Sequence, residues 1–227
     1  MRTGLVSVML TSYNRPKMVR EAIESVLVQT YPNWELFLLD DNSSKETQDV
    51  LASYCEGCPN IKIYQSGVSE EERFKRPGYV VNINAGLKLI DGEFVCYLTD
   101  DDYLLPNAFE LLTTYLSQHD WADVVYGKQK LIRDGQDDGF RGEEGVLSWA
   151  PAAVDHCQVM HRSSLLARTG DWSTTSMRCG DAEFWAQLHG IGCKFFPVHE
   201  PTCVHRYHTQ SLSNKLDRGE LKSEPCE

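Results

Sequence analysis

Long apolar runs are missing from this sequence, and so is a basic N-terminal region followed by an apolar core. We therefore expect a cytoplasmic protein with no membrane span. Basic residues are also scarce, because 22 Lys and Arg stand against 33 Asp and Glu, for a net charge of −11. Nucleic acid is bound by basic surfaces, so this balance argues against nucleic acid as a partner. A phosphorylated substrate would need a metal ion or a local group of basic side chains.

Two phosphate-binding motifs are absent as well. Neither a Walker loop nor Gly-x-Gly-x-x-Gly follows the first expected strand, which excludes a P-loop enzyme and an ordinary dinucleotide-binding domain. Eight cysteines are present, but Cys55–Cys58 is a single Cys-x-x-Cys without a second pair or a histidine at zinc-binding spacing. We interpret it as a loop at the end of a helix. Sequence repeats and low-complexity segments are also lacking.

What is present is an alternation of short apolar runs and amphipathic stretches. At 227 residues and 41% hydrophobic content, the chain is long enough for one well-filled α/β domain. Asn14 is the expected N-cap of the first helix, with Pro16 in its first turn. The rhythm predicts a central, mostly parallel sheet flanked by helices, with right-handed crossovers. Strands are expected at 5–10, 34–39, 61–65 and 94–98, and helices after Pro16, at 45–54, at about 79–90 and after Pro106.

The second half of the chain is less regular. Residues 133–146 are rich in glycine and charge and indicate a mobile loop or a hairpin. Residues 204–213 are polar and are expected to fold back, with disorder beyond about 214. The remaining expected elements are strands at 123–126, 154–160 and 193–198 and a helix at 181–189.

The acidic triplet Asp100–Asp102 lies between the apolar run 94–98 and Pro106. Alone it would be interpreted as a solvated acidic turn, but adjacent carboxylates repel and need a cation, hydrogen bonds or protonation. Hard oxygen ligands at a rigid strand end suit Mg²⁺ or Mn²⁺. Ligands of parallel sheets bind beyond the carboxyl ends of the strands. We therefore expect Thr11–Arg15, Asp40–Ser43 and the triplet to converge.

Taken in order, five motifs resemble the inverting GT-A glycosyltransferases of family 2. The resemblance covers about residues 3–213. Segments Asp155–Arg162 and Gly180–Ala182 also resemble the spore-coat polysaccharide branch of that family. The five motifs are Thr11–Pro16, Ala22–Leu36, Leu39–Ser44, Asn82–Gly86 and Asp100–Asp102.

The resemblance implies a GT-A fold with a smaller acceptor-side sheet, in one domain over 1–213. Residues 1–102 would bind nucleotide, residues 103–213 would bind acceptor, and 214–227 would be a disordered tail. The implied reaction moves a sugar from a UDP- or dTDP-sugar to a hydroxyl of a glycan or small-molecule acceptor, with inversion. Mn²⁺ or Mg²⁺ would stabilise the leaving diphosphate, and a separate carboxylate would take the proton from the attacking hydroxyl.

The resemblance also assigns the metal ligands. The common family pattern is Asp-x-Asp-Asp, three residues, then proline. Counting back from Pro106 places Asp101 at the metal-binding position, with Asp102 beside it and Asp100 facing the ribose. Thr99 departs from the pattern at the first position.

Nucleotide and acceptor roles follow in the same way. Asp41 matches the position that binds the pyrimidine base, supported by Thr11 and Tyr13, and Arg73 matches a basic residue near the nucleotide. Asp181 matches the catalytic base, although a carboxylate at a helix N-terminus can also simply complement the helix dipole.

Four histidines remain as candidates for supporting roles. A C-terminal histidine binds the metal in some relatives, which makes His208, or else His205, a candidate ligand. Either could equally be an ordinary loop histidine. His156 and His161 are interpreted as structural or acceptor-site residues.

Two other functions are compatible with such a fold. A sugar-nucleotide nucleotidyltransferase would need a glycine-rich basic loop after the first strand, and Thr11–Pro16 has no glycine. An inactive relative that binds nucleotide or glycan is disfavoured because Asp101 and Asp181 are both present.

Overall fold

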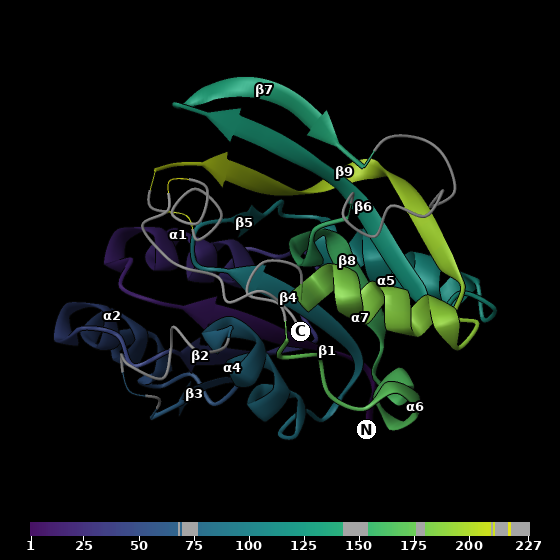
Figure 1. Ribbon diagram of the computed structural model, residues 1–227, viewed down its shortest axis with the longest axis horizontal. Helices are drawn as coiled ribbons and strands as arrows, with labels where there is room; N and C mark the ends of the chain where they lie inside the picture. The colour runs from purple at the N-terminus through teal and green to yellow at the C-terminus, as the bar shows by residue number, and fades with distance from the viewer. Residues whose placement is uncertain are drawn as a thin grey trace.

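The computed structural model describes residues 1–67, 69, 77–142, 154–175, 180–209, 211 and 218 (Figure 1). Its strands form one mixed sheet in the order β3-β2-β1-β4-β8-β6-β9-β5, and β7 pairs with β6. The strands are β1 Arg2–Ser12, β2 Trp34–Asp40, β3 Ile61–Gln65, β4 Gly92–Thr99, β5 Tyr103–Leu104, β6 Val124–Arg133, β7 Gln136–Arg141, β8 Val159–Arg162 and β9 Phe195–Tyr207. The α-helices are α1 Pro16–Leu27, α2 Lys45–Cys55, α4 Gly78–Leu87, α5 Ala108–Gln118, α6 Leu166–Thr169 and α7 Gly180–Gly190, and short 3₁₀ turns are η2 His156–Gln158 and η3 Ser163–Leu165.

The first four strands form the parallel half of the sheet, as the sequence predicts. β1 pairs in parallel with both β2 and β4, and β2 pairs in parallel with β3. β1, β2 and β4 are mostly buried and apolar on both faces because helices cover both faces, whereas β3 lies at the edge and is partly exposed. All four therefore end at one edge, with Thr11 of β1 opposite Thr99 of β4.

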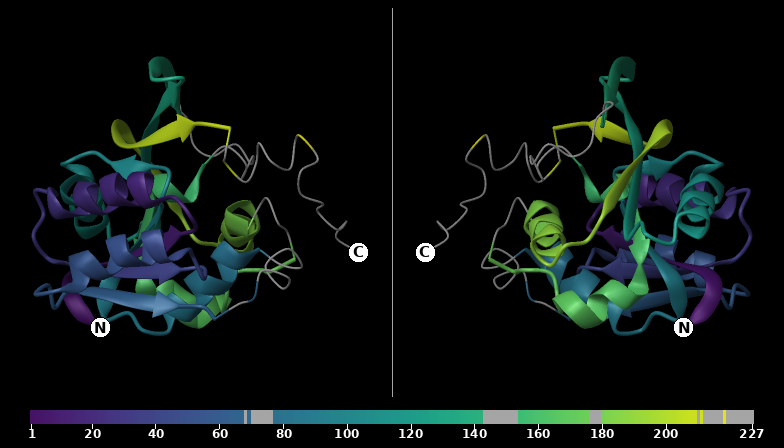
Figure 2. Two further views of the ribbon diagram at one scale, coloured as in Figure 1. Left: turned by 90° about the vertical axis from the view of Figure 1, so that its left-hand side faces the viewer. Right: turned by 90° about the vertical axis from the view of Figure 1, so that its right-hand side faces the viewer.

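Two hydrophobic cores lie on the two faces of this half. One contains the buried faces of α1 and α5 with Leu51 of α2, packed on Val8 and Leu10 of β1. The other packs α4, α7 and Trp172 on Met9, from the opposite face of the same strand. Figure 2 shows α1 and α7 on opposite sides of the sheet. The second core joins the halves of the chain, because α4 and α7 come from different halves.

The strands of the second half of the chain continue the same sheet through β8. β8 pairs antiparallel with both β4 and β6, and β6 runs parallel to β9. The hairpin alternative for residues 133–146 is confirmed over the described part, because β6 and β7 are joined by a turn in which Asp134 and Gly135 both have positive φ.

Three local predictions are wrong. The expected strand 154–160 begins instead with η2, because Asp155 and Gln158 form a capping box that bends the backbone into a 3₁₀ turn. The last strand does not stop at 198 but runs to Tyr207, so part of the expected tail is a strand. Asn14 is not the helix N-cap. Arg15 takes that position, while Asn14 has a φ of 52°.

The Cys-x-x-Cys segment is the helix-end loop that the sequence predicts. α2 ends at Cys55, both cysteines are free, and the Cys58 amide donates to the Cys55 carbonyl oxygen at 3.3 Å. None of the helices in the described ranges has the length and apolarity needed to cross a membrane. Arg73 and nearly all of the expected tail 214–227 lie outside the described residues.

Candidate active site at the carboxyl ends of the strands

The loops after β1, β2 and β4 lie side by side, as expected from the sequence. The Asp100 amide donates to the Thr11 carbonyl oxygen, and the Asp41 amide donates to the Ser12 carbonyl oxygen, both at 3.0 Å. The positive φ of Asn14 brings its side chain across to the β2 loop, where its Oδ1 accepts from the Ser44 amide at 2.6 Å. Asn14 thus joins two loops instead of capping α1.

Arg15 is the cationic partner of the first two triplet carboxylates. Its Nη1 lies 2.5 Å from Asp100 Oδ1 and 3.1 Å from Asp101 Oδ2. Asp100 Oδ2 also accepts from the Tyr13 amide at 2.8 Å. Burial raises the pKa of Asp100 to about 6 although Arg15 opposes that shift. The sequence predicts that the loop Thr11–Arg15 approaches the triplet, but it did not assign the role of ion-pair partner to Arg15.

The end of β9 supplies the other partners of the triplet. Pairing of Tyr103 with Val204 holds β9 against the segment that follows the aspartates. His205 Nδ1 lies 3.0 Å from Asp102 Oδ2, and His208 Nε2 lies 3.0 Å from Asp101 Oδ2. The neighbouring Arg206 donates from its backbone amide to Asp102 Oδ1 at 3.1 Å and from Nε to the Asp101 carbonyl oxygen at 2.5 Å.

These contacts shift the pKa values of the carboxyls in opposite directions. Burial favours the neutral form of Asp101, but the hydrogen bond with His208 and the charge of Arg15 together hold its pKa below the usual value. Burial raises the pKa of Asp102 in spite of its hydrogen bond with His205. The triplet therefore contains carboxyls of unequal acidity.

The donor atoms near the triplet fit a divalent cation. Carboxylate oxygen and imidazole nitrogen atoms of Asp102, Asp155 and His205 lie within 4.8 Å of one another. The hydrogen-bonded pair of Asp101 and His208, 3.0 Å apart, adds a further carboxylate and a further imidazole from the same two segments. Carboxylate oxygen donors suit Mn²⁺ and Mg²⁺. Asp155 was not among the sequence candidates, because only the long-range fold brings it to Asp102.

Asp155 connects the triplet to Asp181 through His156. Its carboxylate accepts from the Cys157 amide at 2.9 Å and lies 3.3 Å from Arg141 Nη2. The His156 Nδ1 atom lies 3.8 Å from Asp155 Oδ1 and 3.6 Å from Asp181 Oδ2. Burial lowers the pKa of His156, but the charges of Asp155 and Asp181 outweigh burial and raise the pKa to about 9.

Asp181 lies in the first turn of α7, as the sequence predicts. One oxygen accepts from the Ala182 amide at 2.9 Å, and the other is the atom facing His156. Gly180 lets the helix start close to α4, because a methyl group there would lie 2.6 Å from Val80 Cγ2. The Gly180 amide donates to the Tyr79 hydroxyl at 3.1 Å.

Asp41 lies at the carboxyl end of β2, close to the start of α4. Its side chain is buried, and its Oδ1 accepts from the Ser66 hydroxyl at 3.3 Å. Gly78 leaves the room for this carboxylate, because a methyl group at Gly78 would lie 3.1 Å from Asp41 Cγ. Thr11 is buried beside the same loops. Arg73 lies outside the described residues, so its predicted contact with the nucleotide has no structural counterpart here.

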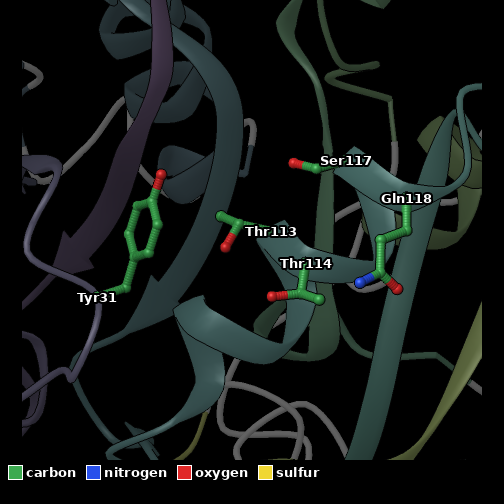
Figure 3. A pocket seen from close by; sticks show the side chains of 5 residues that line it. All are labelled: Tyr31, Thr113, Thr114, Ser117 and Gln118. Carbon is green, nitrogen blue, oxygen red and sulfur yellow. The ribbon is translucent and has the colours of Figure 1, made fainter.

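A shallow pocket of about 310 Å³ lies away from these residues (Figure 3). Tyr31 and the α5 residues Thr113, Thr114, Ser117 and Gln118 line it. The Tyr31 hydroxyl donates to the carbonyl oxygen of Gly4, near the amino end of β1. Thr11 is at the other end of that strand, roughly 20 Å away at 3.3 Å per residue. The pocket therefore does not belong to the aspartate site.

The architecture is that of the GT-A glycosyltransferases. Over 91% of this chain and 59% of the other, the fold is similar to the crystal structure of Staphylococcus aureus TarS 1–349 in complex with UDP-GlcNAc, with a TM-score of 0.77 and 19% identity. Over 95% of this chain and 61% of the other, it is similar to mannosyltransferase PcManGT from Pyrobaculum calidifontis in complex with GDP-Man and Mn²⁺, with a TM-score of 0.69 and 16% identity.

The chain belongs to glycosyl transferase family 2, whose pattern it matches over residues 7–166. It is 38% identical to Protein CgeD of Bacillus subtilis over 211 residues, covering 86% of this chain and 48% of CgeD. It is 29% identical over 130 residues to the Escherichia coli UDP-Glc:alpha-D-GlcNAc-diphosphoundecaprenol beta-1,3-glucosyltransferase WfgD, covering 57% of this chain and 47% of WfgD. The chain thus spans about half the length of these two relatives.

Proposed function

We propose that this protein is an inverting, metal-dependent glycosyltransferase that uses a UDP- or dTDP-sugar donor and acts on a hydroxyl of a glycan or small-molecule acceptor. The observation that carries the proposal is the meeting of Asp101 and Asp102 with His205 and His208, brought together from strands far apart in the chain. Family membership supports sugar transfer, and the nucleotide sugars bound by TarS and PcManGT support the donor class.

Asp101, Asp102 and His208 would hold a divalent cation, Mn²⁺ or Mg²⁺, with Asp155 and His205 beside them. The Mn²⁺ of PcManGT supports this choice. When bound, the cation supplies Lewis-acid stabilisation of the charge that develops on the leaving diphosphate. Arg15 holds Asp100 and Asp101 in place at 2.5 and 3.1 Å.

The nucleoside would lie across the loops after β1 and β2. Asp41 would accept from the pyrimidine N3–H, with Thr11 and Tyr13 beside the base, and Asp100 would face the ribose. Uracil and thymine both offer this N3–H, so the carboxylate suits either nucleotide. Arg73 would add a positive charge near the phosphates.

Asp181 would be the general base that takes the proton from the acceptor hydroxyl as that oxygen attacks the sugar carbon. Its position supports this role, because one carboxylate oxygen is fixed by the Ala182 amide while the other faces His156. Attack from the side opposite the leaving diphosphate gives inversion.

The proposed binding of metal and nucleotide is tested with these two ligands alone, without an acceptor. Calorimetry of UDP, dTDP and GDP with and without Mn²⁺ should show Mn²⁺-dependent binding of UDP or dTDP. Asp101→Ala should weaken that binding at least roughly 10- to 100-fold, since loss of even an outer partner of a metal ligand costs that much. Asp120→Ala, at an exposed turn residue, is the matched control and should bind like wild type. Equal binding without metal would contradict the assignment.

The proposed role of Asp181 as general base is tested with Asp181→Asn. We expect the rate of diphosphate release with a productive acceptor to fall by about 10²- to 10⁴-fold, the usual contribution of a general base. Nucleotide affinity should be nearly unchanged because the base acts on the acceptor. Glu183→Gln removes another carboxylate from the same helical turn, so it controls for the helix dipole. Loss of nucleotide binding in Asp181→Asn would mean that Asp181 is structural.

A further inference from the structure

His156 is a buried histidine, and its Nε2 atom has no polar partner among the described residues. The residue is 8% exposed, and within the described part of the chain neither ring nitrogen forms a hydrogen bond. The Nδ1 atom faces the carboxylates of Asp181 and Asp155, at 3.6 and 3.8 Å, whereas Nε2 faces no such group. An unmade hydrogen bond at a buried polar group is expensive, so folded proteins leave few of them. Such a group in a native fold calls for a partner that is supplied by something else.

His161 shows how this fold treats a structural histidine. It is fully buried in β8, the strand that directly follows the η2 turn of His156, and its Nε2 lies 2.7 Å from the Tyr97 hydroxyl. Its Nδ1 lies 2.9 Å from the carbonyl oxygen of Arg162. Both ring nitrogens of His161 are therefore satisfied internally, whereas Nε2 of His156 has no partner among the described residues.

Aromatic rings hold the imidazole of His156 in place. Tyr79 stacks on it with ring centroids 6.2 Å apart and an interplanar angle of 18°. Trp172 and Tyr97 approach edge-on, with centroids 6.1 and 6.5 Å away. These contacts fix the plane of the ring and offer it no conventional acceptor. The ring is thus held in position while its Nε2 atom stays available to a ligand.

The position of His156 indicates which part of a ligand it could contact. Its Nδ1 atom lies 3.8 Å from Asp155 Oδ1 and 3.6 Å from Oδ2 of the proposed base Asp181. Asp155 in turn lies beside Asp102 and His205 at the proposed cation site. In a transfer reaction the sugar must lie between the diphosphate, which the cation holds, and the acceptor hydroxyl, which the base holds. His156 likewise lies between the proposed cation site and the proposed base.

We propose that His156 hydrogen-bonds a ring hydroxyl of the donor sugar and so contributes to donor selection. This inference rests on the proposed function, because it requires a nucleotide-sugar donor at the aspartate site. A sugar hydroxyl can donate or accept, so it matches an imidazole in either charge state. A site built to bond a substrate hydroxyl discriminates strongly against analogues that lack it.

The test separates sugar binding from nucleotide binding. Calorimetry with Mn²⁺ would compare UDP with UDP-glucose, UDP-galactose and UDP-GlcNAc, and dTDP with dTDP-glucose. The quantity followed is the affinity of each sugar nucleotide divided by that of its parent diphosphate. In His156→Phe, which retains an aromatic ring, this ratio should fall at least about tenfold for the donor that wild type binds best, as expected for one lost hydrogen bond to a buried group. Affinity for UDP or dTDP alone should change by less than about threefold.

Two further variants complete the experiment. His156→Gln, which can still hydrogen-bond, should restore part of the ratio. His161→Phe, at the internally satisfied histidine, should lower the melting temperature but leave the ratio unchanged.

Two results would overturn the inference: a ratio that is unchanged in His156→Phe, whether or not the melting temperature falls, or no difference between any sugar nucleotide and its parent in wild type. Each is compatible with metal-dependent UDP binding that Asp101→Ala weakens. The proposed function could therefore stand while this inference fails.

Discussion

The three carboxylates of the triplet differ in their cationic and hydrogen-bonding neighbours. Arg15 contacts Asp100 and Asp101, whereas His205 contacts Asp102. The three thus lie together in a protein of net charge −11 without being equivalent. The unequal pKa values of Asp100 and Asp101 follow from this division, because burial acts on both and only Asp101 is also bonded to His208.

The buried pair His161–Tyr97 makes a prediction about acid stability. Burial lowers the pKa of His161 to about 4, so the native protein binds this proton less tightly than the unfolded chain, whose value is near 6.5. Stability present above pH 6.5 should be lost as the pH falls toward 4, by about 2 to 3 kcal/mol between pH 7 and pH 4.5. Urea unfolding at pH 7, 5.5 and 4.5 measures it.

The control for this prediction is the double variant Tyr97→Phe/His161→Phe. Replacing both partners by apolar rings leaves no unpaired polar group, so the variant should fold. Its unfolding free energy should fall less steeply with acid than that of wild type. Parallel slopes would show that His161 does not titrate as described.

At the scale of elements, the start of α4 determines where the Asp41 carboxylate can lie. Gly78→Ala would place a methyl group against that carboxylate and displace it. If Asp41 binds the base, UDP affinity should fall roughly 10- to 100-fold, the effect of losing one hydrogen bond to a charged group. Calorimetry with Mn²⁺ measures this.

Gly190→Ala, at the end of α7, is the matched control because a methyl group there meets nothing within 4 Å. It should bind UDP like wild type. Unchanged affinity in Gly78→Ala would remove Asp41 from the nucleotide site.

The parallel strands could be predicted from the sequence because each is a local apolar run with a helix after it. The η2 turn could not be predicted in this way. The side chains of Asp155 and Gln158 form a capping box with the backbone, in a segment whose sequence is otherwise typical of a strand. The length of β9 was underestimated because Pro197 and Pro201 break its apolar pattern, whereas that length is set by pairing with β6. The approach of Asp155 to His205 depends on such long-range pairing and has no local signal.

At the scale of the whole molecule, the two halves share one sheet and one core. β8, from the second half, pairs with β4 of the first, and α7 and Trp172 cover the face of the sheet that includes Met9. The first half of the chain therefore buries a large apolar face only when the second half is present. The division at residue 102 is one of proposed function, and we expect folding to be a single event.

This expectation can be tested on the intact chain and on residues 1–102 alone. The intact protein should unfold in urea in one transition, with circular dichroism and tryptophan fluorescence coinciding. The isolated fragment should show no cooperative transition, because the surface that α7 and Trp172 cover would face water. A cooperative transition in the fragment would contradict it.

The hydrogen bonds from the end of β9 to the triplet also bear on how the protein is made. A ribosome adding roughly 5 to 20 residues per second needs roughly 5 to 20 s to proceed from Asp102 to His208. Throughout that interval the nascent chain carries its aspartates and Arg15 but neither histidine partner. We therefore expect the proposed cation site to be completed late in synthesis, so that a chain truncated before residue 205 retains the acidic motif but binds no metal at this site.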